Sequence, residues 1–526
     1  MPQYSLLTEP WIDVVTLKGE SVAVGLVDLF KNAHTYDRLD FSMPGFDLAV
    51  LRFLVAMVYI VEPPRTYEEW EEMYERGEFT ESFVKGLMKY EERLDLFHEK
   101  YPFMQNNVLR DDINLTSTTA LYKIFPGKTA ATHFKHIPHS TDYTVCPKCA
   151  VSALLATQTF ANSGGVANKE NGQSRSYLAG INGASPLFIY LNGHDIYSTI
   201  VMNCVSNELI SDMSEKSEIA NKSYWPNVIS KDFDVNVNNI GVVDGYLWQP
   251  RNVRFMTAEK ETAVCISCGK DLSDSVSISN MDFRSGNYRI KDGLFWSDPM
   301  VARIHKEDGT ITRAALSGTS RAERAGWRDY ASLLFHEKIV KKSKAGEKTS
   351  EQFVPAVLQQ CSTFGINARI NIFSLIVETS SQPQIKKILS GTYEFSNSLL
   401  DEYMQKQLRD IVRLSESSQS ALYYALKTAY KDETTFSVAE KFWTSLESNF
   451  QYLLHEIIYA DRDFVPVLEW RKILKKRIRQ MFAEESASLL SKSSFIVSLE
   501  KGRADLEKYI YFNLTDKEVK ESVTKE

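Results

Sequence analysis

The chain has 526 residues, and because one core seldom serves more than about 250–300 residues, its length predicts two or three domains. Hydrophobic residues make up 43% and aromatic residues 12% of the chain, which excludes a largely disordered protein. The formal net charge is −7, so any contact with nucleic acid has to come from local basic patches.

The N-terminal residues predict a protein without a leader or a membrane anchor. They have neither a basic segment nor an apolar one, as a signal peptide would require. The longest apolar run, Leu48 to Val61, is interrupted by Arg52 and is too short to span a bilayer. Pro44-Gly45 and Pro63-Pro64 bound this run, so it is interpreted as a buried helix. We expect a soluble, cytoplasmic protein.

The chain up to about residue 390 mixes strands and helices. Residues 162–186 are rich in Asn, Ser and Gly and are predicted to form a long loop, and 341–352 a surface loop. β-branched and aromatic residues predict strands, and longer amphipathic runs predict helices. The predicted strands are Trp11 to Val15, Leu187 to Leu191 and Ile370 to Val377, and the predicted helices are Tyr67 to Phe97 and Ala150 to Ala161.

After residue 390 glycine and proline become rare and apolar residues recur at helical spacing. One predicted helix carries Ala439, Leu446, Phe450, Leu453 and Ile457 on one face, and the next carries Val467, Trp470, Leu474, Ile478 and Met481. Core packing explains the aromatic residues better than a cofactor site does. Breaks near 432, 462 and 490 indicate an antiparallel bundle. We therefore predict an α+β fold, with a mixed domain at 1–390 and a helical (four-helix) bundle at 391–526.

Two cysteine pairs are the most informative motif. They are Cys146-Pro-Lys-Cys149 and Cys265-Ile-Ser-Cys268. Four thiolates from two such turns satisfy tetrahedral Zn²⁺ with no open position, which is typical of a structural site and not of a catalytic one. The rival interpretations are disulfides, which a cytosolic setting disfavours, and unligated core thiols.

A basic stripe marks the third helix of the predicted bundle. Its members are Lys472, Lys475, Lys476 and Arg479. Their i, i+3, i+4 and i+7 spacing places them on one helix face. In an acidic protein this face is a candidate phosphate-contacting surface, and the alternative is an ordinary solvated face.

Three histidines, His133, His136 and His139, recur every third residue, but Pro138 prevents a shared helix face. A second metal site is therefore disfavoured. A polar loop that exposes Phe134 agrees better with the pattern, since an exposed aromatic ring can stack or insert near bases.

Motifs of catalysis are missing from the sequence. It contains no GxxxxGK[ST], no GxGxxG after a strand and no GxSxG, and no His-Glu pair has the second histidine of a zinc protease. The H-x-E and P-C-x-x-C halves of the zinc deaminase signature are also lacking. We therefore expect a protein that is not an enzyme.

Taken together, the motifs resemble the large subunit of the type I-E CRISPR Cascade surveillance complex, the CasA family. The resemblance rests on short islands that occur in the family's order along nearly the whole chain. The islands are Leu6-Leu7-Thr8-Glu9-Pro10-Trp11-Ile12-Asp13-Val14, Cys146 to Ala150, Gly164-Gly165, Cys265-Ile266-Ser267-Cys268-Gly269, Gly293-Leu294-Phe295-Trp296 and Ser381-Gln382.

This resemblance implies a non-catalytic subunit that reads DNA. In the family the guide RNA on other Cascade subunits supplies sequence recognition by base pairing. The large subunit recognises the protospacer-adjacent motif of double-stranded DNA from the minor groove and starts strand separation. The helical bundle holds the displaced strand and helps to recruit the helicase–nuclease.

The resemblance also assigns site residues. A glycine loop that approaches the groove corresponds to Gly164 and Gly165, where the missing Cβ permits close contact. A basic residue that reaches the groove corresponds to Arg284, with Arg289 and Lys291 as rivals.

Two further assignments follow from it. The glutamine wedge that splits the duplex corresponds to Gln382, flanked by Ser381. The loop with Phe134 corresponds to one that contacts other subunits and the motif region. The alternative function is a zinc-stapled protein-interaction subunit without a nucleic-acid role.

Overall fold

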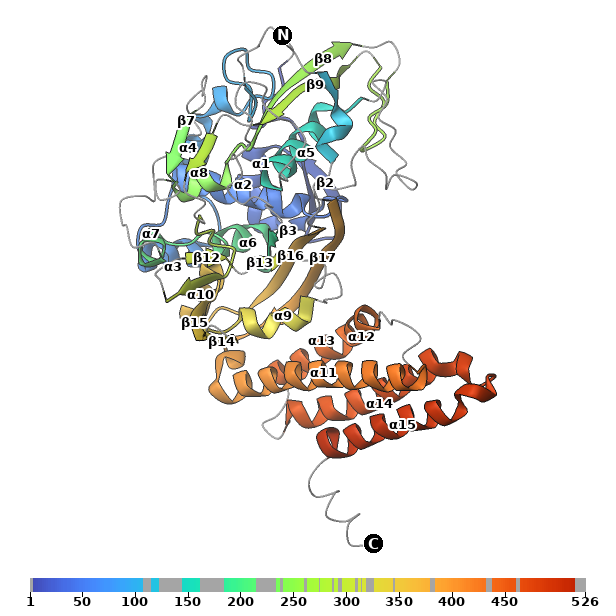
Figure 1. Ribbon diagram of the computed structural model, residues 1–526. Coiled ribbons are helices and arrows are strands. Elements are labelled where there is room, and N and C mark those ends of the chain that lie inside the picture. The colour runs from blue at the N-terminus through green and yellow to red at the C-terminus, as the bar shows by residue number, and fades with distance from the viewer. Residues whose placement is uncertain are drawn as a thin grey trace. The chain divides into compact units, whose positions relative to one another are not determined.

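The computed structural model describes most of the chain, and its contacts divide the chain into two compact units (Figure 1). Unit 1 comprises 1–319, 338–364 and 370–390, and unit 2 comprises 320–337, 365–369 and 391–526. The described residues are 3–106, 115–122, 144–160, 184–213, 233–236, 240–259, 263–273, 275–285, 288–291, 296–307, 311–313, 315–317, 326–343, 346–378, 384–431, 438–459 and 464–515.

Unit 1 begins with a small antiparallel sheet of order β2-β1-β3. Its elements are β1 (Ile12–Thr16), β2 (Ser21–Val24), α1 (Leu26–Asn32) and β3 (Tyr36–Leu39). The indole of Trp11 is fully buried and donates a hydrogen bond of 3.0 Å to the carbonyl of Leu6. The predicted strand at Trp11 to Val15 is confirmed.

The apolar run forms the buried helix α2 (Phe46–Val61), as predicted. Arg52, the charge that interrupts the run, lies inside the core and donates to Asp298 at 2.8 Å. The two side chains are 2% and 3% exposed, and the guanidinium also lies over the rings of Phe188 and Tyr246. Within the described residues, no helix is both long and apolar enough to cross a membrane.

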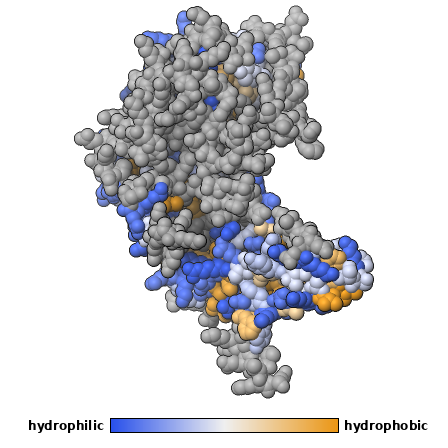
Figure 2. Space-filling model, in the orientation of Figure 1, coloured by the Kyte–Doolittle hydropathy of each residue, from blue (hydrophilic) through white to orange (hydrophobic). Residues whose placement is uncertain are grey.

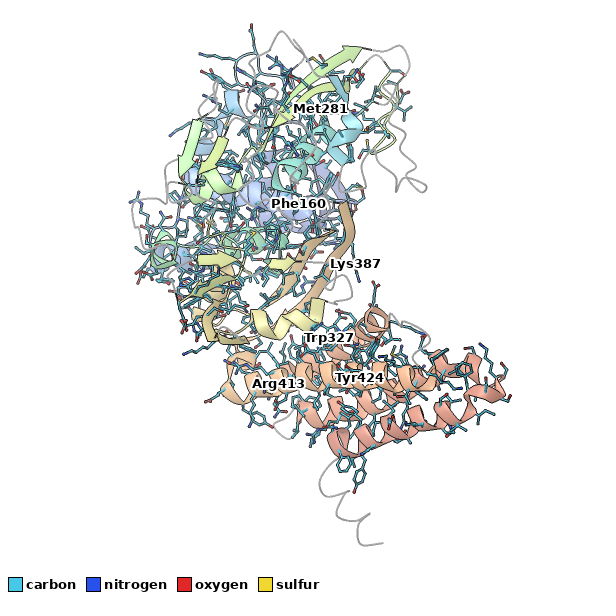
Figure 3. The ribbon with its side chains drawn as sticks, in the orientation of Figure 1. Phe160, Met281, Trp327, Lys387, Arg413 and Tyr424 are labelled. Atoms are coloured by element: carbon cyan, nitrogen blue, oxygen red, sulfur yellow. The ribbon has the colours of Figure 1, made fainter. Side chains whose placement is uncertain are left out.

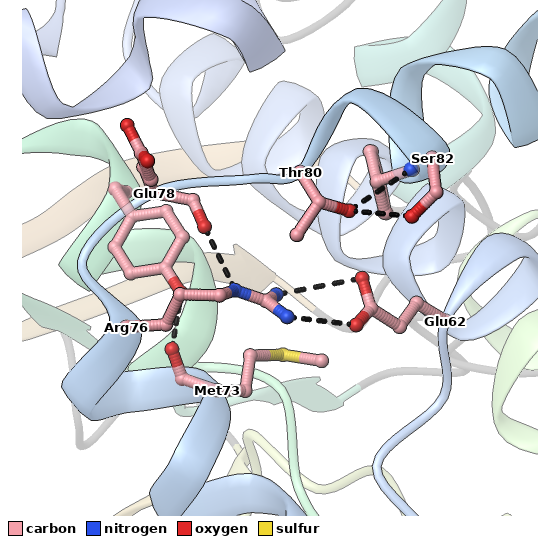
Figure 4. A network of polar contacts seen from close by, with 8 residues as sticks. Glu62, Met73, Arg76, Glu78, Thr80 and Ser82 are labelled. Carbon is pink, nitrogen blue, oxygen red and sulfur yellow. Dashed lines mark hydrogen bonds and ion pairs between the residues drawn. The ribbon is translucent and has the colours of Figure 1, made fainter.

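The predicted helical run 67–97 is divided into α3 (Tyr67–Arg76), α4 (Glu81–Met88) and a short 3-10 turn. Gly77 ends α3 with a φ of 74°, a left-handed conformation that glycine adopts readily, and Thr80 caps α4. Figure 4 shows Arg76, at the end of α3, donating hydrogen bonds of 2.9 Å to the Glu62 carboxylate and to the carbonyl of Glu78.

Three further groups of paired strands follow, and one of them contains the two remaining predicted strands. The first has the order β4-β9-β8, the second β17-β16-β6, and the third pairs β7 with β10 in parallel. Their bounds are β4 (Leu115–Ser117), β6 (Phe188–Asn192), β7 (Phe233–Asn236), β8 (Arg251–Glu259), β9 (Val276–Ser285), β10 (Tyr288–Lys291), β16 (Ala368–Glu378) and β17 (Gln384–Phe395). The strands predicted near 187–191 and 370–377 are confirmed.

The surface loop predicted at 341–352 is wrong. These residues fall largely within β14 (Glu337–Ser343) and β15 (Gly346–Phe353), which lie in a sheet of order β12-β11-β15-β14. Strand pairing overrode a local composition of Lys, Ser and Glu that favours loops. The other short strands are β5 (Ala184–Pro186), β11 (Arg303–Lys306), β12 (Ile311–Arg313) and β13 (Ala315–Ser317).

The remaining helices of unit 1 are short, apart from α5. This helix spans Pro147–Thr159 and confirms the helix predicted at 150–161. The others are α6 (Ile196–Met202), α7 (Asn207–Met213), α8 (Val242–Tyr246) and α10 (Ala356–Thr363).

Unit 2 is helical, and its long helices form the C-terminal bundle that the sequence predicted (Figure 1). The helix predicted across 439–457 is interrupted at Leu446, which separates α12 from α13. The helices are α9 (Gly326–Leu333), α11 (Glu402–Ala429), α12 (Ala439–Ser445), α13 (Glu447–Tyr459), α14 (Pro466–Ser486) and α15 (Ile496–Tyr509).

Helix α9 lies far from the bundle in sequence but belongs to its core. Trp327, labelled in Figure 3, is fully buried and donates a hydrogen bond of 2.9 Å to the carbonyl of Trp443. Its ring centroid lies 4.9 Å from those of Trp443 and Phe450 and 5.4 Å from that of Trp470. The aromatic residues of unit 2 are therefore core packing, as the sequence indicated.

Two contacts hold α11 against its neighbours. The buried indole of Trp470 on α14 donates to the Ser415 hydroxyl of α11 at 2.8 Å. Gly502 on α15 lies against α11 so closely that a Cβ would come within 2.4 Å of the carbonyl oxygen of Ala425.

On the solvent side, Figure 2 shows hydrophilic residues over much of the visible face of unit 2, with hydrophobic residues between them.

Candidate functional site

The four cysteines of the two motifs come together in unit 1. The sulfurs of Cys146, Cys149, Cys265 and Cys268 all lie within 4.8 Å of one another. The first three residues are buried and Cys268 is exposed. This cluster could hold a metal ion, as the spacing predicted.

The first pair of cysteines is positioned by the start of α5. Cys146 is the N-cap residue, and its sulfur accepts the backbone N–H of Cys149 at 3.4 Å. Pro147 occupies the first helical position, where its lack of an N–H costs no hydrogen bond. The turn therefore directs both sulfurs to the same side of the helix start.

The second pair is held against the first by backbone contacts. Thr144 and Cys265 form a parallel bridge, and the N–H of Cys146 donates to the Cys265 sulfur at 3.3 Å. Gly269 closes the second turn with a φ of 74°, and its N–H donates to the Cys265 carbonyl at 2.8 Å. The contact between Cys146 and Cys265 joins residues that are 119 positions apart in sequence.

The electrostatics of the cluster favour a cation among the sulfurs. Hydrogen bonds with Cys146 and Cys265, together with burial, raise the pKa of the Cys149 thiol. Hydrogen bonds from Cys146 and Cys149 lower the pKa of Cys265. Neighbouring thiolates repel one another, so crowded sulfurs disfavour full ionisation without a compensating charge. A divalent cation would stabilise all four as thiolates.

Sequence reasoning missed a polar contact that anchors the first turn. Lys148, between the two cysteines, forms an ion pair of 2.5 Å with Asp13 of β1. Both side chains are about one third exposed, at 29% and 34%. The pair ties the cluster to the N-terminal sheet. The sequence gives only a weak indication of this ion pair, namely that a charged residue, Lys148, lies inside the Cys-x-x-Cys turn.

Arg284 is already engaged within its own sheet. Its Nε donates to the two carboxylate oxygens of Asp282 at 2.9 and 3.1 Å. The two side chains, which follow each other on one face of β9, are 11% and 12% exposed. Arg289 and Lys291 belong to β10, where the ladder pairs Arg289 with Asp234 and Lys291 with Asn236.

The basic stripe lies on α14, and its residues differ in their surroundings. Lys472 and Arg479 are exposed and form ion pairs with Glu469 and Glu507 at 3.0 and 2.5 Å. Lys476 is exposed and Lys475 is half-buried. Surface pairs of this kind contribute little to stability, so these cations are available to other anions at small cost.

Five predicted contact residues lie outside the described residues, namely Phe134, Gly164, Gly165, Ser381 and Gln382. The last two belong to the five-residue connection 379–383 between β16 and β17, which are neighbours in one sheet. Such a short connection requires the two strands to be antiparallel. Because all five residues lie outside the described residues, the positions of their side chains are not given by the structure.

A mixed sheet-and-helix unit with a Cys₄ cluster that could hold a metal ion, followed by a helical bundle, defines a class of large two-unit proteins. The model of the family "CRISPR-associated protein Cse1" matches residues 5–481. The chain therefore belongs to the Cse1 family, and the predicted resemblance to the type I-E Cascade large subunit is confirmed.

Solved structures of low sequence identity share the fold. The Cse1 of Acidimicrobium ferrooxidans superposes with a TM-score of 0.73 at 17% identity, covering 98% of this chain and 99% of that one. The Cse1 of Thermobifida fusca gives 0.72 at 18% identity, covering 97% and 98%. A structure titled "CRISPR RNA-guided surveillance complex" contains a chain with a TM-score of 0.70 at 16% identity, covering 96% and 100%.

Proposed function

We propose that this chain is a non-catalytic, DNA-binding subunit of an RNA-guided antiviral complex in the cytoplasm. It recognises the protospacer-adjacent motif of double-stranded DNA from the minor groove, starts strand separation and helps to recruit a helicase–nuclease. The observation that carries the proposal is the match of the Cse1 family model over residues 5–481. A chain of this fold in a structure titled an RNA-guided surveillance complex supports guide-RNA-bearing subunits as partners.

Zn²⁺ is the cation we propose for the Cys₄ cluster. Four thiolates without an open position are typical of structural zinc, whereas Mg²⁺, Ca²⁺ and Mn²⁺ prefer oxygen ligands. Bound there, the ion would supply a covalent link between the two halves of unit 1 and no catalysis. The staple would keep the motif-reading elements near 284–291 in register with α5.

The setting of Gln382 supports its role as the wedge. The connection 379–383 follows the 11 residues of β16 and precedes the 12 of β17, so two long paired strands would support its tip. Proline restricts φ through its ring, so Pro383 favours a stiff connection. Opening a duplex costs a few kcal/mol per unstacked step, so a wedge has to be held rigidly while guide pairing begins.

The contact of Arg284 with Asp282 favours one of its two rivals, Arg289 or Lys291, as the residue that reaches the groove. Arg284 is tied to Asp282 by a two-oxygen contact and would have to give it up. Arg289 and Lys291 lie on β10, which pairs in parallel with β7.

The basic stripe of α14 fits a backbone-contacting role. Phosphates can replace Glu469 and Glu507 as partners of Lys472 and Arg479, because exposed ion pairs exchange easily. Contacts of this type add affinity without reading sequence. We propose that the stripe holds the displaced strand.

The deciding experiment uses the chain assembled with its guide-RNA complex and two DNA targets. One target is fully paired, and the other is already unpaired beside the motif. Gln382→Ala should reduce strand displacement on the paired target strongly and on the unpaired target little. The measurement is the fraction of displaced strand reported by a fluorescent base analogue.

Gln384→Ala is the matched control, because it changes the same residue type two positions along the chain. Equal loss on both targets with Gln382→Ala would mean that the residue supports the fold or the motif contact and is not a wedge. If the assembled complex binds both targets alike with and without this subunit, the DNA role fails and the protein-interaction alternative stands.

A further inference from the structure

The Cys₄ cluster has one unprotected corner. Cys146, Cys149 and Cys265 are 2%, 7% and 1% exposed, whereas Cys268 is exposed to solvent. Gly269, the next residue, has nothing within 4 Å of the position that a Cβ would take. A small solute can therefore approach the cluster from the side of Cys268.

A second sulfur lies within reach of the exposed one. The Sγ of Cys146 is 3.8 Å from that of Cys268, and the two residues belong to different turns. A solvent-exposed cysteine placed beside a second thiol is the arrangement on which oxidation to a disulfide depends. The remaining thiols, Cys204 and Cys361, are fully buried and distant in sequence from this corner.

We propose that Cys268 is a site of reversible oxidation by peroxides, and that oxidation links it to Cys146 while the metal leaves. The Cys268 thiolate attacks one oxygen of hydrogen peroxide, the O–O bond breaks, and a sulfenic acid and hydroxide form. The Cys146 thiolate then attacks that sulfur and a second hydroxide leaves. Two protons convert the hydroxides to water, and the two sulfurs have lost two electrons to the peroxide.

The consequence of this pairing depends on which turns it joins. A disulfide within one turn would leave the two halves of the cluster unconnected once the ion has gone. A Cys146–Cys268 disulfide instead joins the same two turns that the ion joined. The connection between the turns is therefore kept, with a disulfide in place of the metal ion. The two thiols that remain, Cys149 and Cys265, are too few to retain zinc tightly.

The test uses the zinc-loaded full chain treated with increasing hydrogen peroxide. Released zinc is followed with a colorimetric chelator, and disulfides are mapped by mass spectrometry after alkylation without reduction. We expect one zinc released per chain, a cross-linked peptide pair that contains Cys146 and Cys268, and recovery on adding a thiol reductant with zinc. Cys204 and Cys361 should remain alkylatable only after unfolding, which controls for general oxidation.

Melting temperature separates the proposed outcome from simple damage. The oxidised protein should melt close to the zinc-loaded form, and the reduced protein stripped by a chelator should melt lower than both. Cys268→His keeps a zinc ligand of an accepted type but removes the exposed thiol, so its zinc should be released more slowly at equal peroxide.

Three results would overturn the proposal. They are disulfides confined to Cys146–Cys149 and Cys265–Cys268, zinc release from Cys268→His at the rate of the parent protein, and an untreated chain without zinc. The test does not depend on DNA binding, so its failure leaves the proposed role in DNA recognition standing.

Discussion

Because Gly502 lies at the contact between α11 and α15, the substitution Gly502→Ala tests whether close helix packing or helix propensity determines the change in stability. Alanine is favoured over glycine in a helix interior by about 1 kcal/mol, so propensity alone predicts a more stable protein. The new Cβ, however, would lie 2.4 Å from the Ala425 carbonyl oxygen and 3.2 Å from the Cβ of Ala429. The two effects have opposite signs.

The steric term should prevail because its obstacle is backbone. The carbonyl of Ala425 cannot rotate away, and ordinary contact at 3.4 Å requires the two helices to separate by about 1 Å. Overpacking of a well-packed site costs about 1–3 kcal/mol, and a backbone obstacle places this site in the upper part of that range. After the gain in propensity, we expect a net loss of about 1–2 kcal/mol.

Hydrogen exchange of the full chain, read by mass spectrometry on peptides from α11 and α15, measures this loss. We expect about 5–30-fold faster exchange in both helices, the factor that corresponds to such a loss. Ala504→Gly, at an exposed position of the same helix, is the matched control and calibrates the propensity term. Slower exchange in Gly502→Ala would refute the close-packing argument.

Two further predictions concern the proposed DNA contacts. Replacing the α14 stripe by alanine should weaken binding to all DNA targets alike and flatten its dependence on salt, measured by fluorescence anisotropy at several ionic strengths; a changed motif preference with an unchanged salt slope would contradict a phosphate-contacting role. Replacing Arg289 and Lys291 together by alanine should reduce discrimination between motif variants more than Arg284→Ala does, measured as the ratio of affinities for two motifs. Equal ratios in the two variants would contradict the argument from the ion pair of Arg284 with Asp282.

The features predictable from sequence were those set by local pattern. The apolar run of α2, the strand at Trp11 to Val15 and the helical spacing around Trp470 each carry their own periodicity. The Cys₄ cluster was also predictable, because metal-ligand spacing is a signal that survives a separation of 119 residues. The zinc ion, the motif-reading loops and the domain boundary remain predictions.

What sequence could not provide were pairings set by long-range packing. Helix α9 has apolar residues at Trp327, Tyr330 and Leu333, a spacing that indicates a helix but not its place in the helical unit. Asp282 and Arg284 alternate as strand residues do, yet nothing local shows that they neutralise each other. The composition of β14 and β15 favours a loop, and these residues form strands because they pair with neighbouring strands.

The position of α9 has a consequence for the order in which the protein is made. Trp327 leaves the ribosome about 140 residues before Trp470, its ring partner in the finished core. At synthesis rates of about 5–20 residues per second, the indole waits roughly 7–30 s for that partner. During this interval a large aromatic surface has no place to pack, which is when a nascent chain is most prone to aggregate. The helical unit cannot close until nearly the whole chain exists, so a ribosome-bound chaperone has a defined segment to protect.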